Sequence, residues 1–163
     1  MNNGITLTGL AVALLLFVEG ARAEDKEPIA VVALGPAGEW GFPGGEFSRG
    51  PSAAVEFALI KDWVEVEVGG AKLFRRGNSE WETDVVFRKP FTLSETTEFM
   101  IGLGPTWNKA TGEGWKVGTT FMADFMFWSS PERKYGWFVE PGYSVSNGER
   151  SLGLSVGFLI GIR

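Results

Sequence analysis

The sequence contains neither cysteine nor histidine, and each absence excludes a kind of chemistry. Without cysteine the chain forms no disulfide bond, which by itself leaves its cellular compartment undecided. Without histidine it has no Ser-His-Asp triad, no imidazole general base and no imidazole ligand for a metal. We therefore predict that the protein is not an enzyme, and we expect no catalytic residue, metal or cofactor.

Basic residues are also scarce. Lys and Arg number 15 against 20 Asp and Glu, which gives a net charge of -5. Because binding to nucleic acid needs clustered Lys and Arg to neutralise phosphates, we expect no nucleic-acid partner. The many glycines between Gly35 and Gly50 do not form a phosphate-binding loop, since neither a Lys-Ser/Thr pair nor a helix follows them.

Long apolar runs are absent except near the N-terminus. The run ITLTGLAVALLLFV at residues 5–18 precedes Ala21-Arg22-Ala23, which matches an A-x-A cleavage site. We interpret residues 1–23 as a secretory signal peptide, cleaved after Ala23 to leave a single domain over residues 24–163. The alternative is a retained membrane anchor, but a run of about 14 residues is short for a helical span.

The clearest strand signal is the segment SLGLSVGFLIGI, from Ser151 to Ile162. Alternate positions are apolar, and the positions between them are small, with Leu159 as the exception. Successive side chains of a strand point to opposite faces, so this segment predicts a strand with one apolar face and one small, polar face. Its apolar positions are Leu152, Leu154, Val156, Phe158, Ile160 and Ile162.

The same alternation recurs along the mature chain and predicts an all-β fold, an eight-stranded antiparallel up-and-down transmembrane barrel. The glycine- and proline-rich segment from Gly35 to Gly50 is predicted to be a long loop. The expected strands are residues 29–34, 53–60, 63–74, 81–88, 98–107, 115–127, 135–145 and 151–162.

The hairpin formed by the second and third predicted strands specifies a register. A two-residue turn at Lys61-Asp62 places Phe57 opposite Val66, so that the apolar faces of both strands coincide. The same register places Glu56 opposite Glu67.

Alternation alone does not say which face is inside the barrel. A lipocalin-like soluble barrel of the periplasm, binding a small apolar ligand, would carry the apolar face inside. Three features favour the inverted, membrane-embedded arrangement: a glycine-rich polar face suited to a narrow lumen, large aromatic residues at two levels of the apolar face, and strands of the right length to cross a bilayer. These aromatic residues are Trp81, Trp107 and Trp115 at one level, and Phe127, Tyr135 and Trp137 at the other.

The chain resembles the small eight-stranded outer-membrane barrels of Gram-negative bacteria. More narrowly, residues 124–128 (DFMFW), 136–144 (GWFVEPGYS) and 151–155 (SLGLS) look like those of a group of secreted bacterial barrel proteins that has no assigned activity. The resemblance implies the barrel fold and the bacterial outer membrane, with membrane lipid as a partner. We expect a monomer with a structural or surface-interaction role, and an extracellular partner could bind loops such as Gly35 to Gly50.

The polar face predicts a charged network inside the barrel. We interpret this network as a polar plug that fills the lumen, and a carboxylate site for a hard cation or a narrow cation path are the alternatives. Because acids outnumber bases there, we expect a shared proton, an inward-folded Arg75 or Arg76, or a bound cation. The predicted network comprises Glu56, Glu65, Glu67, Asp84, Arg88, Lys116, Asp124 and Glu140.

Overall fold

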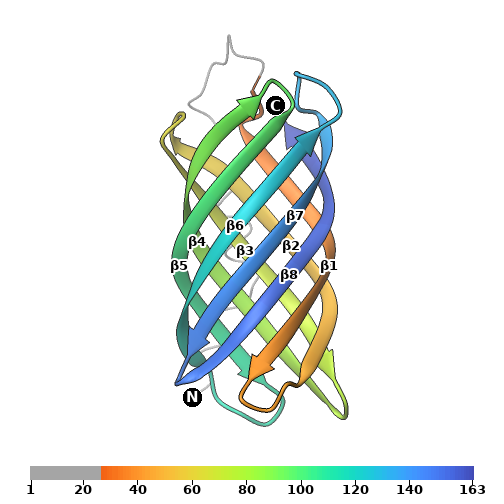
Figure 1. Cartoon of the computed structure of the whole chain (residues 1–163), viewed down its shortest axis with the longest axis vertical. Helices are drawn as coiled ribbons and strands as arrows, with labels where there is room; N and C mark the ends of the chain where they lie inside the picture. Colours follow the sequence, from red (N-terminus) through yellow and green to blue (C-terminus); the bar gives the residue numbers. More distant parts are fainter. Residues whose placement is uncertain (1–26) are drawn as a thin grey trace, which may run out of the picture.

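A computed structural model describes residues 27–163, and the predicted signal peptide and its cleavage site lie outside this range. The described residues form a closed antiparallel barrel in which each strand pairs with its neighbours in sequence and β1 pairs with β8 (Figure 1). This confirms the predicted eight-stranded fold. The strands are β1 (Ala30–Phe42), β2 (Phe47–Ile60), β3 (Val64–Arg75), β4 (Asn78–Ser94), β5 (Thr97–Ala110), β6 (Lys116–Trp128), β7 (Tyr135–Ser146) and β8 (Glu149–Ile162).

The barrel has two distinct ends. The start of β1 and the end of β8 meet at one end, where Ala30 pairs with Ile162, and we call this the terminal end (upper end in Figure 1). The β1–β2, β3–β4, β5–β6 and β7–β8 connections lie at the opposite end, which we call the distal end. Within residues 27–163 there is no helix with the length and apolar content needed to cross a membrane.

The structure places the apolar face of the strands on the outside. In β8, Leu152, Leu154 and Phe158 are more than half exposed, whereas Ser151 and Leu159 face the lumen and are buried. The alternative of a lipocalin-like barrel with an apolar interior is therefore wrong about which face is inside. The predicted aromatic levels are confirmed, with Trp81 and Trp115 toward the distal end, and Phe127 stacked on Trp137 toward the terminal end at 4.1 Å between ring centroids.

The predicted β2–β3 register is confirmed in the strands but not at the turn. Phe57 pairs with Val66 and Glu56 with Glu67, as expected. The turn, however, is one residue longer: Ile60 pairs with Val64, and a bulge between Ala58 and Ile60 absorbs the difference. A bulge adds one unpaired residue to one strand, so both apolar faces stay outside despite the longer turn.

The prediction of a long loop from Gly35 to Gly50 is wrong, because most of this segment belongs to β1 and β2 and only residues 43–46 connect them. The glycines permit close approach of neighbouring strands instead of marking a loop. A Cβ at Gly35 would collide with the carbonyl oxygen of Val156 on β8, and one at Gly50 with that of Lys72 on β3.

Two prolines in the same segment are a further reason why its sequence does not look like that of a strand. Pro36 and Pro51 lie directly opposite each other in the β1–β2 pair. Because proline has no N–H to donate, the ladder on its other side is interrupted. The β1–β8 register passes from Leu34 to Ala37, and the β2–β3 register resumes at Ser52 after Arg49.

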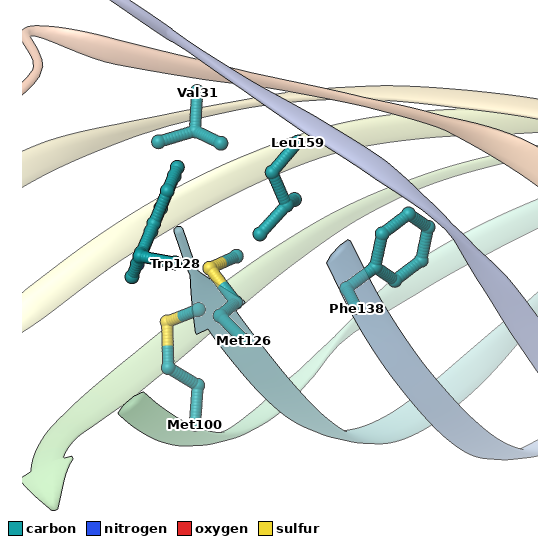
Figure 2. Close-up of a cluster of buried hydrophobic side chains, with 6 residues drawn as sticks. All are labelled: Val31, Met100, Met126, Trp128, Phe138 and Leu159. Carbon is teal, nitrogen blue, oxygen red and sulfur yellow. The ribbon is translucent and has the colours of Figure 1, made fainter. Parts of the chain in front are cut away.

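An apolar cluster fills the lumen between its middle and the terminal end. Figure 2 shows its side chains converging from β1, β5, β6, β7 and β8. Leu159, the exception to alternation in β8, is one of its members and is only 1% exposed. The cluster comprises Val31, Met100, Met126, Trp128, Phe138 and Leu159.

Candidate functional site

Arg88 on β4 lies at the centre of the lumen with only 2% of its surface exposed. Its Nη1 lies 3.1 Å from Oε2 of Glu56 and 3.1 Å from Oδ2 of Asp124. Its Nη2 lies 2.6 Å from Oε1 of Glu67 and also pairs with Glu140. One guanidinium thus links β4 to carboxylates from β2, β3, β6 and β7, and we call these five residues the Arg88 cluster.

Local sequence makes room for Arg88. In the β4–β5 register Arg88 lies opposite Gly102, and a Cβ at that position would lie 2.8 Å from Cγ of Arg88. Met122 on β6 lies beside the guanidinium, with its sulfur 3.8 Å from Nη2. A glycine on the neighbouring strand therefore lets the long side chain cross the lumen.

Asp84 extends the acidic layer on the distal side of the Arg88 cluster. It is 6% exposed, lies against Gly69 on the facing strand, and its Oδ1 has no hydrogen-bond partner among residues 27–163. Oδ1 of Asp124 is likewise buried without a partner there. Both aspartates line a cavity of about 80 Å³ that also contacts Glu67 and Glu140. A polar cavity of this size has room for ordered water.

Besides Asp84, two further residues of the predicted network lie outside the Arg88 cluster. Lys116 is at the distal rim, where its Nζ lies 3.0 Å from Glu113 and 3.6 Å from Glu149. Glu65 is opposite Arg88 in the β3–β4 register, but it lines a separate cavity of about 220 Å³ at the terminal end.

Neither Arg75 nor Arg76 reaches the Glu56–Glu67 pair, although Arg75 occupies a lumen-facing position at the distal rim. Arg75 pairs with Glu46 at the distal end, and Arg76 is exposed on the β3–β4 turn. The cation that faces Glu56 and Glu67 is therefore Arg88, which the alternation of β4 already placed on the lumen face.

Sequence reasoning missed a second polar group, at the terminal end. Nε1 of Trp128 donates a hydrogen bond to Glu98 at 3.2 Å, and Arg133 forms an ion pair with the same carboxylate at 2.9 Å. Arg133 lies in the connection between β6 and β7, where a turn assignment gives no side-chain direction. Trp128 follows Asp124 and Met126 at every second position of β6, and this alternation was the available signal that its side chain points into the lumen.

These layers limit the chemistry of the lumen. The guanidinium of Arg88 is surrounded by carboxylates, and the apolar cluster lies between it and the terminal end. Among residues 27–163 no group of three or more Asp and Glu has the arrangement needed to hold a metal ion.

Charge on the strands is sorted by face. Among residues 27–163, every acidic strand residue occupies a lumen-facing position, and the outward-facing charged positions are all basic. The lumen-facing acids are Glu39, Glu56, Glu65, Glu67, Glu80, Glu82, Asp84, Glu98, Asp124, Glu140 and Glu149. The outward-facing bases are Arg49, Lys72, Lys89, Lys109 and Arg150.

The outward lysines lie against aromatic rings. Nζ of Lys72 is 4.9 Å from the ring centroid of Trp81, and that of Lys109 is 5.6 Å from Trp115. Toward the terminal end, Lys89 lies 5.8 Å from Phe91. Each aliphatic stem thus follows apolar surface, a typical arrangement for Lys at the edge of an apolar region.

No protein-family model and no curated protein sequence matches this chain. Solved structures share its fold. Ail, the attachment invasion locus protein of Yersinia pestis, is 16% identical with a TM-score of 0.63, over 82% of this chain and 98% of Ail. Neisserial surface protein A is 14% identical with a TM-score of 0.68, over 82% and 97%. The N-terminal β-barrel domain of Pseudomonas aeruginosa OprF is 15% identical with a TM-score of 0.58, over 82% and 98%. The predicted likeness to small eight-stranded outer-membrane barrels is confirmed at the level of the fold.

Proposed function

We propose that this protein is a non-enzymatic, monomeric barrel of the bacterial outer membrane, exported by its signal peptide, with a structural or surface-interaction role. The observation that carries the proposal is the sorting of charge: the chain is acidic, yet among residues 27–163 no acid lies on the outer face of the strands. A surface facing water would have no reason to exclude acids while carrying bare Leu, Phe and Trp.

Lipid accounts for both properties of the outer face. Covering an exposed Leu or Phe side chain contributes about 1.5–3 kcal/mol, and residues such as Leu103 and Phe158 are more than half exposed. Bases at the margins of the apolar band extend toward lipid phosphates, and anionic lipid favours each nearby Lys or Arg by about 1 kcal/mol.

The short connections favour a structural role over a large binding surface. With the chain ends in the periplasm, as is usual for such barrels, the distal end faces the outside of the cell. Its connections are residues 43–46, 76–77, 111–115 and 147–148. Ail has been solved in complex with the heparin analogue sucrose octasulfate, which shows that a barrel of this fold can bind an external ligand. An external partner here would contact these short connections and the strand ends beside them.

We further propose that the lumen is closed and does not conduct ions. The Arg88 cluster joins side chains from five strands across the lumen, and the apolar cluster lies between it and the terminal end. An ion would have to separate a buried ion-pair network and then pass an apolar constriction, and both steps oppose conduction.

Membrane fractionation of cells expressing the full chain tests the proposal. The protein should sediment with the outer membrane, resist a carbonate wash and require detergent for purification. A folded monomer that stays in the soluble periplasmic fraction would contradict the membrane proposal. In planar bilayers, the purified barrel should leave the baseline conductance unchanged, and stable single-channel steps would contradict the closed lumen.

A further inference from the structure

The outer wall of β1, β2 and β3 carries a groove of about 900 Å³ toward the distal end. Pro36 and Pro51 lie opposite each other along it, and Phe47 and Phe74 contribute aromatic surface. All four occupy outward-facing positions in their strands, so the groove opens toward the surroundings of the barrel. It is separate from the lumen and the Arg88 cluster.

The two Gly-Pro dipeptides, Gly35-Pro36 and Gly50-Pro51, form the groove. At each dipeptide the glycine lies close to the backbone of the neighbouring strand, and the pairing with that strand is interrupted. The side chain that points outward there is a compact proline ring. Nearby, the ring of Phe47 lies over Gly38, where a Cβ would be 3.0 Å from the ring. The outer wall is therefore recessed between rings of Phe47 and Phe74.

Three arginines also line the groove: Arg49, Arg75 and Arg76. Arg75 pairs with Glu46, whereas Arg49 and Arg76 are exposed and have no ion-pair partner among residues 27–163. Arg49 lies opposite Phe74 in the β2–β3 register. Phe74 is two residues before Arg76, which lies on the β3–β4 turn. Two guanidinium groups without an ion-pair partner thus lie beside an apolar recess, on a strand face that carries no acid within the described part of the chain.

We propose that this groove binds one anionic lipid that ends in a phosphate group, with the phosphate held by Arg49 and Arg76 and an acyl chain lying along Pro36 and Pro51. Guanidinium groups bind phosphate through paired, charge-assisted hydrogen bonds. The apolar recess favours a lipid over a free anion, because inorganic phosphate would contact only the arginines whereas a lipid would also bury its acyl chain in the recess. This inference rests on the proposed membrane location and adds a specific lipid site to it.

The test uses the purified full barrel in detergent, with dioleoyl phosphatidic acid as the probe and dioleoyl phosphatidylcholine as the chain-matched comparison. Native mass spectrometry reports how much of each lipid stays bound. The wild type should retain phosphatidic acid roughly tenfold better than phosphatidylcholine, a preference worth about 1.4 kcal/mol. The double variant Arg49→Gln/Arg76→Gln should lose this preference.

The matched control is Lys109→Gln/Arg150→Gln, which removes the same charge from outward positions at the distal end but away from the groove. It should retain the wild-type preference within about twofold. Equal losses in both double variants would overturn the site in favour of general charge attraction. Displacement of phosphatidic acid by millimolar inorganic phosphate would also overturn it, since the recess would then contribute nothing.

A separate measurement distinguishes failure of this site from failure of the membrane proposal. Wild type and both double variants should float with phosphatidylcholine vesicles, because the apolar face alone drives insertion. If they float but show no phosphatidic acid preference, the groove proposal is wrong while the membrane proposal stands. If none of them floats, both proposals are wrong.

Discussion

Glu56 and Glu67 face each other across the β2–β3 pair, and both carboxylates bind the same guanidinium, that of Arg88. Like charges directly opposite on neighbouring strands normally destabilise a sheet. Here the cation from β4 lies within 3.1 Å of one carboxylate and 2.6 Å of the other, and it also pairs with Asp124 and Glu140. We therefore expect the free energy of unfolding to depend more on Arg88 than on any one of its four carboxylate partners.

Removing Arg88 should be strongly destabilising. Arg88→Met leaves three buried carboxylates and the partly buried Glu140 without their shared cation, and breaking a buried ion pair from one side costs about 3–5 kcal/mol. Equilibrium unfolding in urea, with the barrel in lipid vesicles, measures this loss. Arg75→Met at the distal rim is the control, because its partner Glu46 is exposed and such pairs contribute at most about 1 kcal/mol. Equal losses from both substitutions would contradict the central role of Arg88.

Removing one acid should cost much less. In Glu67→Gln the guanidinium keeps Glu56, Asp124 and Glu140, and repulsion within the cluster decreases. The same unfolding measurement should give a loss below about 1 kcal/mol, since a neutral amide can still accept a hydrogen bond from Arg88. A loss as large as that of Arg88→Met would show that the Glu67–Arg88 pair alone accounts for the stabilisation, and would contradict a cation shared among four carboxylates.

Gly102 should tolerate no side chain. In Gly102→Ala the new methyl group would lie 2.8 Å from Cγ of Arg88 and 2.5 Å from Cγ1 of Val86. Overpacking of this kind costs about 1–3 kcal/mol in unfolding free energy. Gly114→Ala is the matched control, because a Cβ there has no heavy atom within 4 Å. If both variants unfold like the wild type, Gly102 is not what admits Arg88.

The leader gives a prediction independent of the barrel interior. Cleavage after Ala23 should leave Glu24 as the first residue of the exported protein, because Ala21-Arg22-Ala23 follows a short apolar run. N-terminal sequencing of the membrane fraction identifies the site. A mature protein that still begins at Met1 would show that the run is a retained anchor.

Alternation was sufficient to predict much of the fold. The alternation in β8, which only Leu159 breaks, and the agreement between the apolar faces of β2 and β3 predicted strand identity, register and face, and the structure confirms them. Alternation was not sufficient for the segment from Gly35 to Gly50. Glycine and proline there permit close packing of neighbouring strands, but a segment rich in these residues has the composition that is typical of a loop. Composition cannot separate these two uses of the same residues.

The lumen was predictable by face but not by contact. Period-two alternation placed Arg88, Glu56 and Asp124 on one face, yet it could not show that a single guanidinium reaches four other strands. That arrangement depends on barrel closure and strand stagger, which bring residues far apart in sequence to one level. Leu159 broke the pattern for a related reason, since the apolar cluster it joins exists only in the closed barrel.

The central claim is that the outward apolar face of the strands meets lipid, and paired arginine substitutions on β6 test it most directly. Phe121, near the middle of the strand, is 48% exposed, and Val117, near its distal end, is 62% exposed, and both point outward. In vesicles, Phe121→Arg should lower the unfolding free energy by about 2–4 kcal/mol and Val117→Arg by about 0–1 kcal/mol, because the cost of a charge falls from midplane to interface. Equal effects at the two positions, in a protein that stays folded and monomeric without detergent or lipid, would contradict the claim.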